Sequence, residues 1–573
     1  MYSNNPIVLE LISLLKQFGI SRIVVSPGGR HVQFIISLER DPYFKLYSVV
    51  DERSAAFFAL GLIQETGEPV AVACSSGTAC MNYGSAIAEA YYQHLPLLVL
   101  SSDRLPHFLN QGEEQMYNQL EPFKTITKFS AQLPYINNDL DRWQCNRLIN
   151  EGLLALTIHG RGPVHLNFPM LTIYGDGFNI TELPKARKIS FHPFRGKNVF
   201  GSIARRIKDK TVMIIWGQSV VCTERLMNGV KSFLMKTDSV LMSDYMANCR
   251  LSEAYKNTLS IFHTLKPDEV PSVVPDIVIT IGGNQIYNGE LKSFLSKGNA
   301  EHWSVSPTGE VCDPFHTLTD IFQMNEDLFF ESLADSCEQS STKDYSFLWE
   351  QFRELPEPPT EHYDEFQAIG WLIHSLPENS DLQLANSNTI RMAQFFNIPE
   401  DVRVNCNRGV NGIDGSMSTA IGFASATEKP VFYITGELSF FYDMNSLWIK
   451  HISHKLRILL LNNDGGAFMY HQKRIVDGRK SITLAAGNPV NAKGWAETTG
   501  FRYISANDSD SLKKGIEVLT DMNQDVPVIL EVFTDLVTDG EIISKYFATL
   551  DRRSFADKVQ DRLNRMAGKI FKK

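Results

Sequence analysis

The sequence has few cysteines and no pairing pattern among them. Its 573 residues include eight cysteines, with no CxxC pair and no histidine cluster at zinc spacing, so disulfide staples and structural zinc are not expected. No apolar run approaches the roughly 18 residues that a membrane-spanning helix needs. The N-terminus lacks the basic start and apolar core of a signal peptide. We therefore expect a cytoplasmic protein with no membrane span.

An excess of basic residues is also lacking. The chain carries 55 Lys and Arg against 65 Asp and Glu, a formal net charge of −10, whereas a nucleic-acid-binding surface needs a basic footprint. We expect no nucleic-acid partner. The composition is 43% hydrophobic and 21% charged, as in globular proteins, and at roughly 150 residues per domain the length predicts about three or four domains.

Short apolar segments alternate with helical patterns in the first part of the chain. Asn5 and Pro6 are typical of a helix start, and Gly19 of its end. Apolar strands that each end in glycine or polar residues are expected at 22–26, 46–50, 70–74 and 97–101. This alternation predicts a parallel sheet covered on both faces, whose ligands bind beyond the carboxyl ends of the strands.

Two further sets of strands and helices follow. The second set includes strands near 211–216, 276–283 and 303–306, and the third includes strands near 382–385, 402–406, 431–435, 456–462 and 527–533. Between them, residues 336–364 are rich in Ser, Pro and charged residues, which predicts a solvated linker. We therefore predict an α/β protein with three doubly wound parallel-sheet domains, at 1–185, 186–345 and 346–573.

Two strand ends of the third set carry residues suited to a metal and a diphosphate. One strand leads into Gly436-Glu437-Leu438-Ser439, and the next leads into Asn462-Asn463-Asp464-Gly465-Gly466. A glycine lets the backbone approach a diphosphate closely, and a carboxylate, a carboxamide and a backbone carbonyl are oxygen ligands for Mg²⁺ or Ca²⁺. The alternative is a pair of unrelated strand-end turns in a nucleotide-binding fold.

The spacing and residue types resemble the thiamine diphosphate-binding signature, Gly-Asp-Gly followed by Asn-Asn. The resemblance implies thiamine diphosphate as the cofactor, with Mg²⁺, or Mn²⁺ or Ca²⁺ in its place. Glu437 and Asn463 would bind the metal through their side chains and Gly465 through its carbonyl. Glu437 stands where the family has aspartate, and its extra methylene displaces the carboxylate by roughly 1.5 Å, which the looser Ca²⁺ shell tolerates better than Mg²⁺. We expect reduced metal affinity.

Glu52 occupies the place of the glutamate that, in this superfamily, hydrogen-bonds the aminopyrimidine ring and activates the cofactor. Such a carboxyl benefits from a dry site that raises its pKa. The alternative is an ordinary helix-start residue, which favours the helix dipole.

Longer strings resemble one family within the superfamily, 2-succinyl-5-enolpyruvyl-6-hydroxy-3-cyclohexene-1-carboxylate (SEPHCHC) synthase of menaquinone biosynthesis. They are residues 51–62, 75–79, 102–104, 162–167 and 407–415. The resemblance implies decarboxylation of 2-oxoglutarate and addition of the succinyl carbanion equivalent to isochorismate. It further implies an aminopyrimidine-binding first domain, a Rossmann-like second domain and a diphosphate-binding third domain.

The same resemblance implies a homodimer or homotetramer in which Glu52 of one subunit faces the diphosphate site of another. The cofactor-binding residues would be Glu52, Ser76, Gly77, Ile413, Gly436, Glu437, Leu438, Ser439, Asn463 and Gly465, with Ile413 as the apolar wedge under the cofactor. Ser387, Arg391 and Arg408 would hold the distal carboxylate of 2-oxoglutarate, since an arginine fork matches a carboxylate. Arg30, Arg104 and Gln115 would bind isochorismate.

The isochorismate pocket departs from the family pattern. Gly29 replaces a serine, Glu114 replaces an asparagine, and Asn288 or Gly289 stands where the family has a lysine. A protonated His31 is one replacement for the lost cation, and a local hydrogen-bonding role is the alternative. Three other functions therefore stay open: a paralogue with a different acceptor, a catalytically weakened binding module, and an acetolactate synthase-like or pyruvate decarboxylase-like enzyme.

Overall fold

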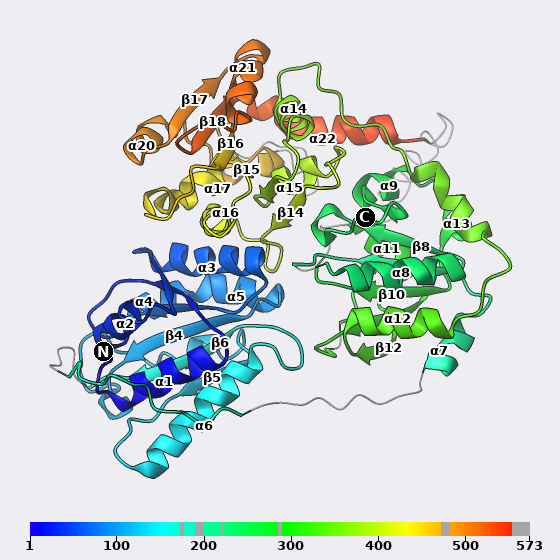
Figure 1. The fold of residues 1–573 in the computed structure, drawn as a ribbon. Helices are drawn as coiled ribbons and strands as arrows, with labels where there is room; N and C mark the ends of the chain where they lie inside the picture. Colours follow the sequence, from blue (N-terminus) through cyan, green and yellow to red (C-terminus); the bar gives the residue numbers. More distant parts are fainter. Residues whose placement is uncertain are drawn as a thin grey trace, which may run out of the picture.

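The computed structural model describes residues 1–171, 177–189, 200–220, 222–284, 289–310, 312–470 and 482–552. The named strands form three six-stranded sheets, and every pairing between them is parallel. Figure 1 shows the three sheets following one another along the chain, each flanked by helices. The predicted fold class is confirmed.

The N-terminal sheet has the strand order β2-β1-β3-β4-β6-β5. Its strands are β1 (Arg22–Val25), β2 (Lys45–Ser48), β3 (Val70–Cys74), β4 (Leu97–Asp103), β5 (Phe129–Gln132) and β6 (Val164–Pro169). Its helices are α1 (Pro6–Gln17), α2 (Val32–Glu39), α3 (Glu52–Thr66), α4 (Thr78–Asn82), α5 (Gly84–Tyr92) and α6 (Asp139–Ala155), with short 3-10 turns η1 (Pro106–Phe108) and η2 (Glu121–Phe123).

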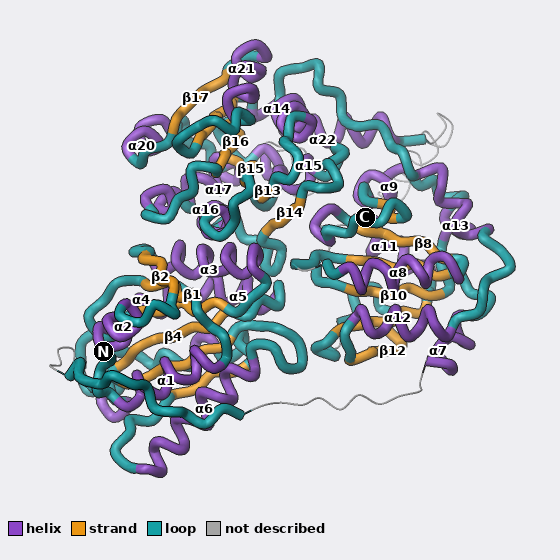
Figure 2. The backbone as a smooth tube through the Cα atoms, in the orientation of Figure 1, coloured by secondary structure: helices purple, strands orange, loops and turns teal. Residues whose placement is uncertain are grey.

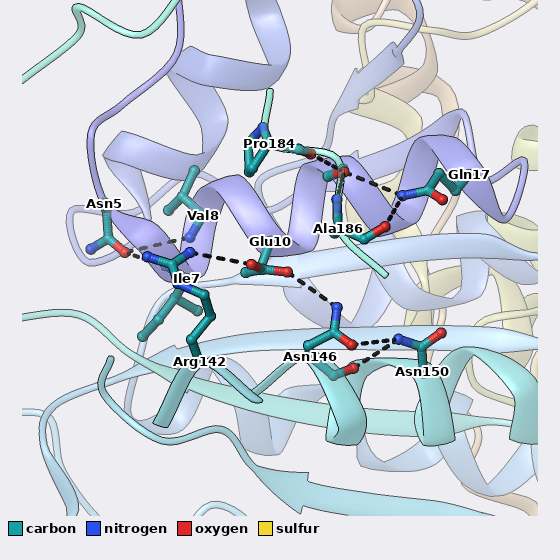
Figure 3. Close-up of polar contacts among 11 residues, drawn as sticks. Asn5, Ile7, Val8, Glu10, Gln17, Arg142, Asn146, Asn150, Pro184 and Ala186 are labelled. Atoms are coloured by element: carbon teal, nitrogen blue, oxygen red, sulfur yellow. Dashed lines mark hydrogen bonds and ion pairs between the residues drawn. The ribbon is translucent and has the colours of Figure 1, made fainter. Parts of the chain in front are cut away.

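Helix α1 begins as its sequence predicts. The Asn5 side chain accepts hydrogen bonds from the backbone N–H groups of Ile7 and Val8, and Pro6 fills the first helical position. Figure 3 shows the helix held on two sides. Buried Glu10 pairs with Arg142 and accepts a hydrogen bond from Asn146, both on α6. On the other side the backbone at 184–186 runs along the helix, so the segment after β6 returns to the N-terminal domain.

The central sheet has the order β12-β11-β10-β7-β8-β9, the arrangement of a dinucleotide-binding Rossmann sheet. Its strands are β7 (Val212–Trp216), β8 (Ser239–Ser243), β9 (Ala254–Tyr255), β10 (Ile277–Ile281), β11 (Glu301–Ser306) and β12 (Leu318–Gln323). Its helices are α7 (Phe200–Ile207), α8 (Glu224–Lys236), α9 (Thr258–Thr264), α10 (Val270–Val273), α11 (Gly289–Gly298), α12 (Glu326–Ser336) and α13 (Asp344–Trp349), with η3 (Tyr245–Ala247) and η4 (Glu350–Phe352).

The C-terminal sheet has the order β14-β13-β15-β16-β18-β17, which repeats the order of the N-terminal sheet when each is counted from its first strand. Its strands are β13 (Asp381–Leu384), β14 (Arg403–Cys406), β15 (Val431–Gly436), β16 (Leu456–Asn462), β17 (Arg502–Ala506) and β18 (Val528–Phe533). Its helices are α14 (Glu365–His374), α15 (Asn388–Ala393), α16 (Ser416–Ala424), α17 (Glu437–Tyr442), α18 (Ala467–Tyr470), α19 (Ile482–Ala485), α20 (Lys493–Thr498), α21 (Ser509–Leu519) and α22 (Leu536–Leu550), with η5 (Met444–Trp448).

The N-terminal and C-terminal domains share a core through α3 and α16. Figure 2 shows these helices between the two sheets, and buried residues of both join one hydrophobic cluster. Glycines allow the close crossing: a Cβ on Gly61 would lie 2.0 Å from the carbonyl oxygen of Thr419, and one on Gly422 would lie 2.1 Å from that of Phe58. Side chains at either position would separate the helices.

The predicted linker at 336–364 is wrong in its middle part. Tyr345, Trp349 and Phe352 are buried beside the central sheet, where α13 and η4 complete its core. The polar residues around them hide this aromatic spacing in the sequence. We propose that the boundary between the central and C-terminal domains follows Phe352, a few residues beyond the expected division at 345/346, and that the first boundary is near 185.

Candidate active site

The two strand ends expected to hold a metal lie side by side. β15 and β16 pair in parallel with Gly436 opposite Leu461, so the residues after both strands emerge at the same sheet edge. Glu437 is the first residue of α17, and Asn462 is the last of β16. We call residues 436–439 and 462–466 the clamp. The predicted strand, helix, strand unit is therefore confirmed.

The clamp contains buried oxygen atoms without partners. Glu437 and Asn463 are 5% and 3% exposed, and neither Glu437 Oε1 nor Asn463 Oδ1 has a hydrogen-bond partner among the described residues. Burial raises the pKa of Glu437 to about 8, although the backbone of Gly465 hydrogen-bonds its carboxylate. Each unsatisfied buried oxygen costs about 1–3 kcal/mol. A carboxylate and an amide oxygen left open in this way fit a divalent cation.

Open space adjoins the clamp where a diphosphate is expected. A Cβ on Gly436 would meet no atom within 4 Å. The Ser439 hydroxyl donates a hydrogen bond of 2.7 Å to the carbonyl of Ile413 and lies 3.0 Å from the Ser416 hydroxyl. The Ile413 side chain is 38% exposed. Of the expected cofactor residues, the structure thus brings Ile413 together with the clamp.

Glu52, Ser76 and Gly77 lie at the carboxyl edge of the N-terminal sheet. Glu52 opens α3, is half-buried, and has its pKa raised mainly by burial. The buried Ser76 hydroxyl has no hydrogen-bond partner in the described part of the chain, and the Gly77 N–H donates to the Gln119 side chain. Within the described residues of one chain, no hydrogen bond or ion pair joins these three to the clamp. The single chain therefore presents the expected cofactor residues as two separate groups.

Two arginines of the expected acceptor pocket lie near each other. Arg30 is 4% exposed, and burial followed by the charge of Arg104 lowers its pKa. Arg104 pairs with the Glu113 carboxylate at 2.9 Å and donates to the Glu114 carbonyl. Gln115 is exposed, and its backbone packs against Gly77. The Arg30 N–H donates to the Ser75 hydroxyl, so the pocket residues surround the loop after β3.

His31 does not supply the cation that the pocket lacks. It is fully buried, and burial lowers its pKa to about 4. Its ring is therefore neutral near pH 7 in this chain, which argues against it as a replacement for the family lysine. Asn288 lies outside the described residues.

The expected donor residues come from two neighbouring strand ends. Ser387 follows β13 in a strained backbone conformation, with φ 72°, and its carbonyl accepts a hydrogen bond from Arg391. Arg408 follows β14, is 4% exposed, and donates to the Asn386 side chain at 2.8 Å. Its Nε has no partner among the described residues. Asn386 therefore links the Ser387 turn to Arg408.

Sequence reasoning missed several residues that hold the site together. The Asn386 amide donates to the carbonyls of Asn407 and Gly412, and the Glu89 carboxylate accepts from the N–H groups of Gly409 and Val410 at 2.8 Å. Asn386 directly precedes Ser387 at a strand end, a signal that could have identified it. Glu89 lies inside α5 of another domain, and the sequence offers no signal for its role.

The comparisons with known proteins agree with this geometry. Residues 10–121 match the family described as thiamine pyrophosphate enzyme, N-terminal TPP binding domain. SEPHCHC synthase of Bacteroides fragilis is 40% identical, covering 96% of this chain and 100% of the relative. Those of Phocaeicola vulgatus and Flavobacterium johnsoniae are 38% and 31% identical, covering 97% and 96% of this chain and 100% of each relative.

The chain belongs to the SEPHCHC synthase family.

Membership of the SEPHCHC synthase family confirms an enzyme, a thiamine diphosphate-dependent transferase, and implies a divalent metal beside the cofactor. The clamp residues fit that metal, because two of their buried oxygens have no partner within the described ranges. The similarity runs through nearly the whole chain, so neither a paralogue with another acceptor nor a weakened binding module is favoured. Among the described residues, no helix has the length and apolar character needed to cross a bilayer.

Proposed function

We propose that the protein decarboxylates 2-oxoglutarate and joins the remaining four-carbon unit to isochorismate, releasing CO₂, with thiamine diphosphate and a divalent metal as cofactors. The observation that most supports this function is a pair of buried oxygens on Glu437 and Asn463, at adjacent strand ends, to which no described residue hydrogen-bonds. It occurs in a chain whose relatives carry the SEPHCHC synthase name over nearly their full length.

The clamp would hold the metal and the cofactor diphosphate. Glu437 and Asn463 would bind the metal through their side chains and Gly465 through its carbonyl. Gly436, Leu438 and Ser439 would contact the diphosphate. Ile413, whose carbonyl accepts a hydrogen bond from the Ser439 hydroxyl, would pack against the rings of the cofactor. When bound, thiamine diphosphate supplies an electron sink for the carbanion that decarboxylation leaves. The protein contributes its position and a dry, preorganised environment.

Glu52 would act on the cofactor bound by a second copy of the chain. Its carboxyl makes no hydrogen bond with the side chain of another described residue, and burial keeps its pKa raised, which suits proton transfer. Val50, Val410 and Ile413 are exposed apolar residues beside the two groups. A homodimer, or a homotetramer built from dimers, would cover them and bring Glu52, Ser76 and Gly77 of one subunit to the clamp of the other.

The donor side would recognise the second carboxylate of 2-oxoglutarate. Arg408 is buried, no described residue hydrogen-bonds to its Nε, and Arg391 and Ser387 come from the neighbouring strand end. A guanidinium presents two parallel N–H groups to a carboxylate. A substrate with a methyl end would leave the buried arginine without an anion, which is unfavourable.

The acceptor side would recognise the carboxylates of isochorismate. Arg30 and Arg104 repel each other, and the pKa of Arg30 is lowered partly for this reason, so an anion between them is stabilised. The ion pair of Arg104 with Glu113 is partly exposed and is worth at most about 1 kcal/mol. It can therefore open for the substrate. Gln115 adds an amide at the rim.

We propose a cytoplasmic location. All eight cysteines are free thiols, including exposed Cys312, as is usual in a reducing compartment. Fractionation of the producing cells tests this proposal, and recovery of the protein with extracytoplasmic fractions would contradict it.

Release of CO₂ tests the donor half of the function. Purified protein is held with thiamine diphosphate, Mg²⁺ and 2-oxoglutarate, and CO₂ is measured with time. We expect release that depends on all three additions and falls to background in Glu52→Gln. No release above the Glu52→Gln background would overturn the proposed function, and a preference for pyruvate would overturn the donor assignment.

A further inference from the structure

Two buried carboxylates hold the side-chain amide of Asn463. Its Nδ2 donates to Glu365 Oε1 at 3.0 Å and to Asp539 Oδ2 at 3.2 Å. Glu365 opens α14 and Asp539 lies in the first turn of α22, so three separate elements meet at this amide. All three residues are buried, with exposed fractions of 4% or less.

The hydrogen bonds fix which way the amide faces. An amide nitrogen has two hydrogens to donate, and both are taken by carboxylate oxygens, which accept. The reversed amide would place its oxygen against two carboxylate oxygens. Asn463 Oδ1 is therefore the open atom of the amide, and it has no partner among the described residues. An oxygen held open in a buried site is suited to a cation.

The Asp539 carboxylate is itself held in place, whereas Glu365 Oε2 has no hydrogen-bond partner among the described residues. The Glu365 N–H donates to Asp539 Oδ1 at 3.2 Å, and the Thr534 hydroxyl donates to Asp539 Oδ2 at 2.5 Å. No ion pair among the described residues involves Glu365 or Asp539. Nor do three acidic, His or Cys side chains converge in a metal-binding arrangement in the described part of the chain. Both carboxylates hydrogen-bond to Asn463 of the clamp. Burial, followed by repulsion from nearby carboxylates, raises the pKa of Glu365 and of Glu437, and this repulsion acts between Glu365 and Glu437 and between Asp539 and Glu437.

We propose that Glu365 and Asp539 are positioning residues for the metal: they lock the Asn463 amide with its oxygen open to the divalent cation. Outer partners of this kind orient a ligand and typically change metal affinity by about 10- to 100-fold when removed. The inference rests on the proposed metal ligands Glu437 and Asn463. It adds two residues, far from the clamp in sequence, to the set that determines metal affinity.

Metal binding tests the proposal without reference to catalysis. Mn²⁺ is titrated into protein saturated with thiamine diphosphate, and free Mn²⁺ is followed by electron paramagnetic resonance. We expect Glu365→Met, which removes the acceptor, to weaken Mn²⁺ binding about 10- to 100-fold. Glu365→Gln keeps an acceptor oxygen without the charge, and we expect it to restore most of the affinity.

Asp539→Leu and Asp539→Asn make the same comparison at the second carboxylate, which accepts the other amide hydrogen of Asn463. These two variants replace the Glu365 pair if Glu365→Met does not fold. Equal losses in the Gln and Met variants would overturn positioning, because they would show an effect of charge alone. Parental affinity in Glu365→Met would overturn the inference while leaving the clamp intact. A parent that binds no Mn²⁺, with Glu437→Ala indistinguishable from it, would overturn the metal site and the inference together.

Asn462, the residue before Asn463, provides a control because its amide also donates to a buried carboxylate. The buried carboxylate of Glu531 accepts a hydrogen bond of 2.7 Å from the amide of Asn462. Glu531→Met removes the same kind of bond from an asparagine that is not an expected ligand, together with the bonds that Glu531 accepts from the Ala492 N–H and the Tyr503 hydroxyl. We expect it to lower the thermal unfolding midpoint while the folded protein retains Mn²⁺ affinity. A loss as large as in Glu365→Met would contradict a specific role for the Asn463 contacts.

Discussion

Arg408 is expected to determine the preference for a 2-oxo acid that carries a second carboxylate. The side chain is 4% exposed, one of its N–H groups is fixed by Asn386, and its Nε has no partner among the described residues. Arg408→Lys keeps a positive charge but loses the fork of donors, and Arg408→Met loses both. The two variants therefore separate charge from geometry.

The size of the effect follows from the contacts available. A hydrogen bond to a charged group contributes about 1.5–3 kcal/mol, and about 1.4 kcal/mol corresponds to a factor of ten. We expect kcat/KM for 2-oxoglutarate to fall about tenfold in Arg408→Lys and about 100-fold in Arg408→Met. The value for pyruvate, which has no second carboxylate, should change little. Steady-state CO₂ release with each substrate measures both.

Arg457 offers a matched control for the arginine series. It is 1% exposed and donates to the backbone carbonyls of His454 and Leu456, away from the strand ends that form the site. Arg457→Lys should lower the thermal unfolding midpoint but leave the ratio of the two kcat/KM values unchanged. Equal losses for 2-oxoglutarate and pyruvate in Arg408→Met would refute the specificity argument.

Three further predictions concern the metal, the assembly and pH. Glu437→Ala should abolish metal-dependent thiamine diphosphate binding, whereas Glu437→Asp should preserve or tighten it. Titration calorimetry with and without Mg²⁺ measures this binding. If Glu437→Ala binds the cofactor as tightly as the parent protein does, the metal assignment is wrong. Mixing inactive Glu52→Gln and Glu437→Ala subunits under exchange conditions should recover about a quarter of the parental activity. Half of the random dimers are mixed, and each mixed dimer holds one complete site out of two. No recovery despite proven exchange would exclude a site shared between subunits. Burial lowers the pKa of His302 from 6.5 to about 4, so below pH 6.5 the unfolded chain binds a proton that the folded protein does not. The free energy of unfolding is therefore unaffected by this group above pH 6.5 and decreases as the pH falls toward 4. Between pH 7.5 and 5.0 the decrease is about 2 kcal/mol. The thermal unfolding midpoint should therefore fall less in His302→Gln than in the parent over this range, and identical falls would contradict the assignment.

The clamp could be predicted from sequence because its chemistry is local to two strand ends. Apolar strands 430–435 and 456–461 end in Gly436-Glu437 and in Asn462-Asn463, and parallel strands bring such ends to one edge. The partners of Asn463 could not be predicted in this way. Glu365 and Asp539 are 98 and 76 residues distant, and each alone resembles a helix-start acid.

Strands with little apolar character also escaped prediction. β5 and β17 are half-buried at sheet edges, with one fully buried residue each, so neither contains a continuous apolar run. β6 is buried throughout but contains His165 and Asn167, which hydrogen-bond to Ser101 inside the sheet. Tertiary contacts satisfy these polar groups, and the sequence pattern does not reveal such contacts.

The product formed from both substrates tests the central claim most directly. The protein is incubated with thiamine diphosphate, Mg²⁺, 2-oxoglutarate and isochorismate, and the mixture is examined by mass spectrometry beside a Glu52→Gln control. The account predicts an adduct with the mass of the two substrates less CO₂, present with the parent and missing with Glu52→Gln. Consumption of 2-oxoglutarate without that adduct, or an equal yield from Glu52→Gln, would contradict it.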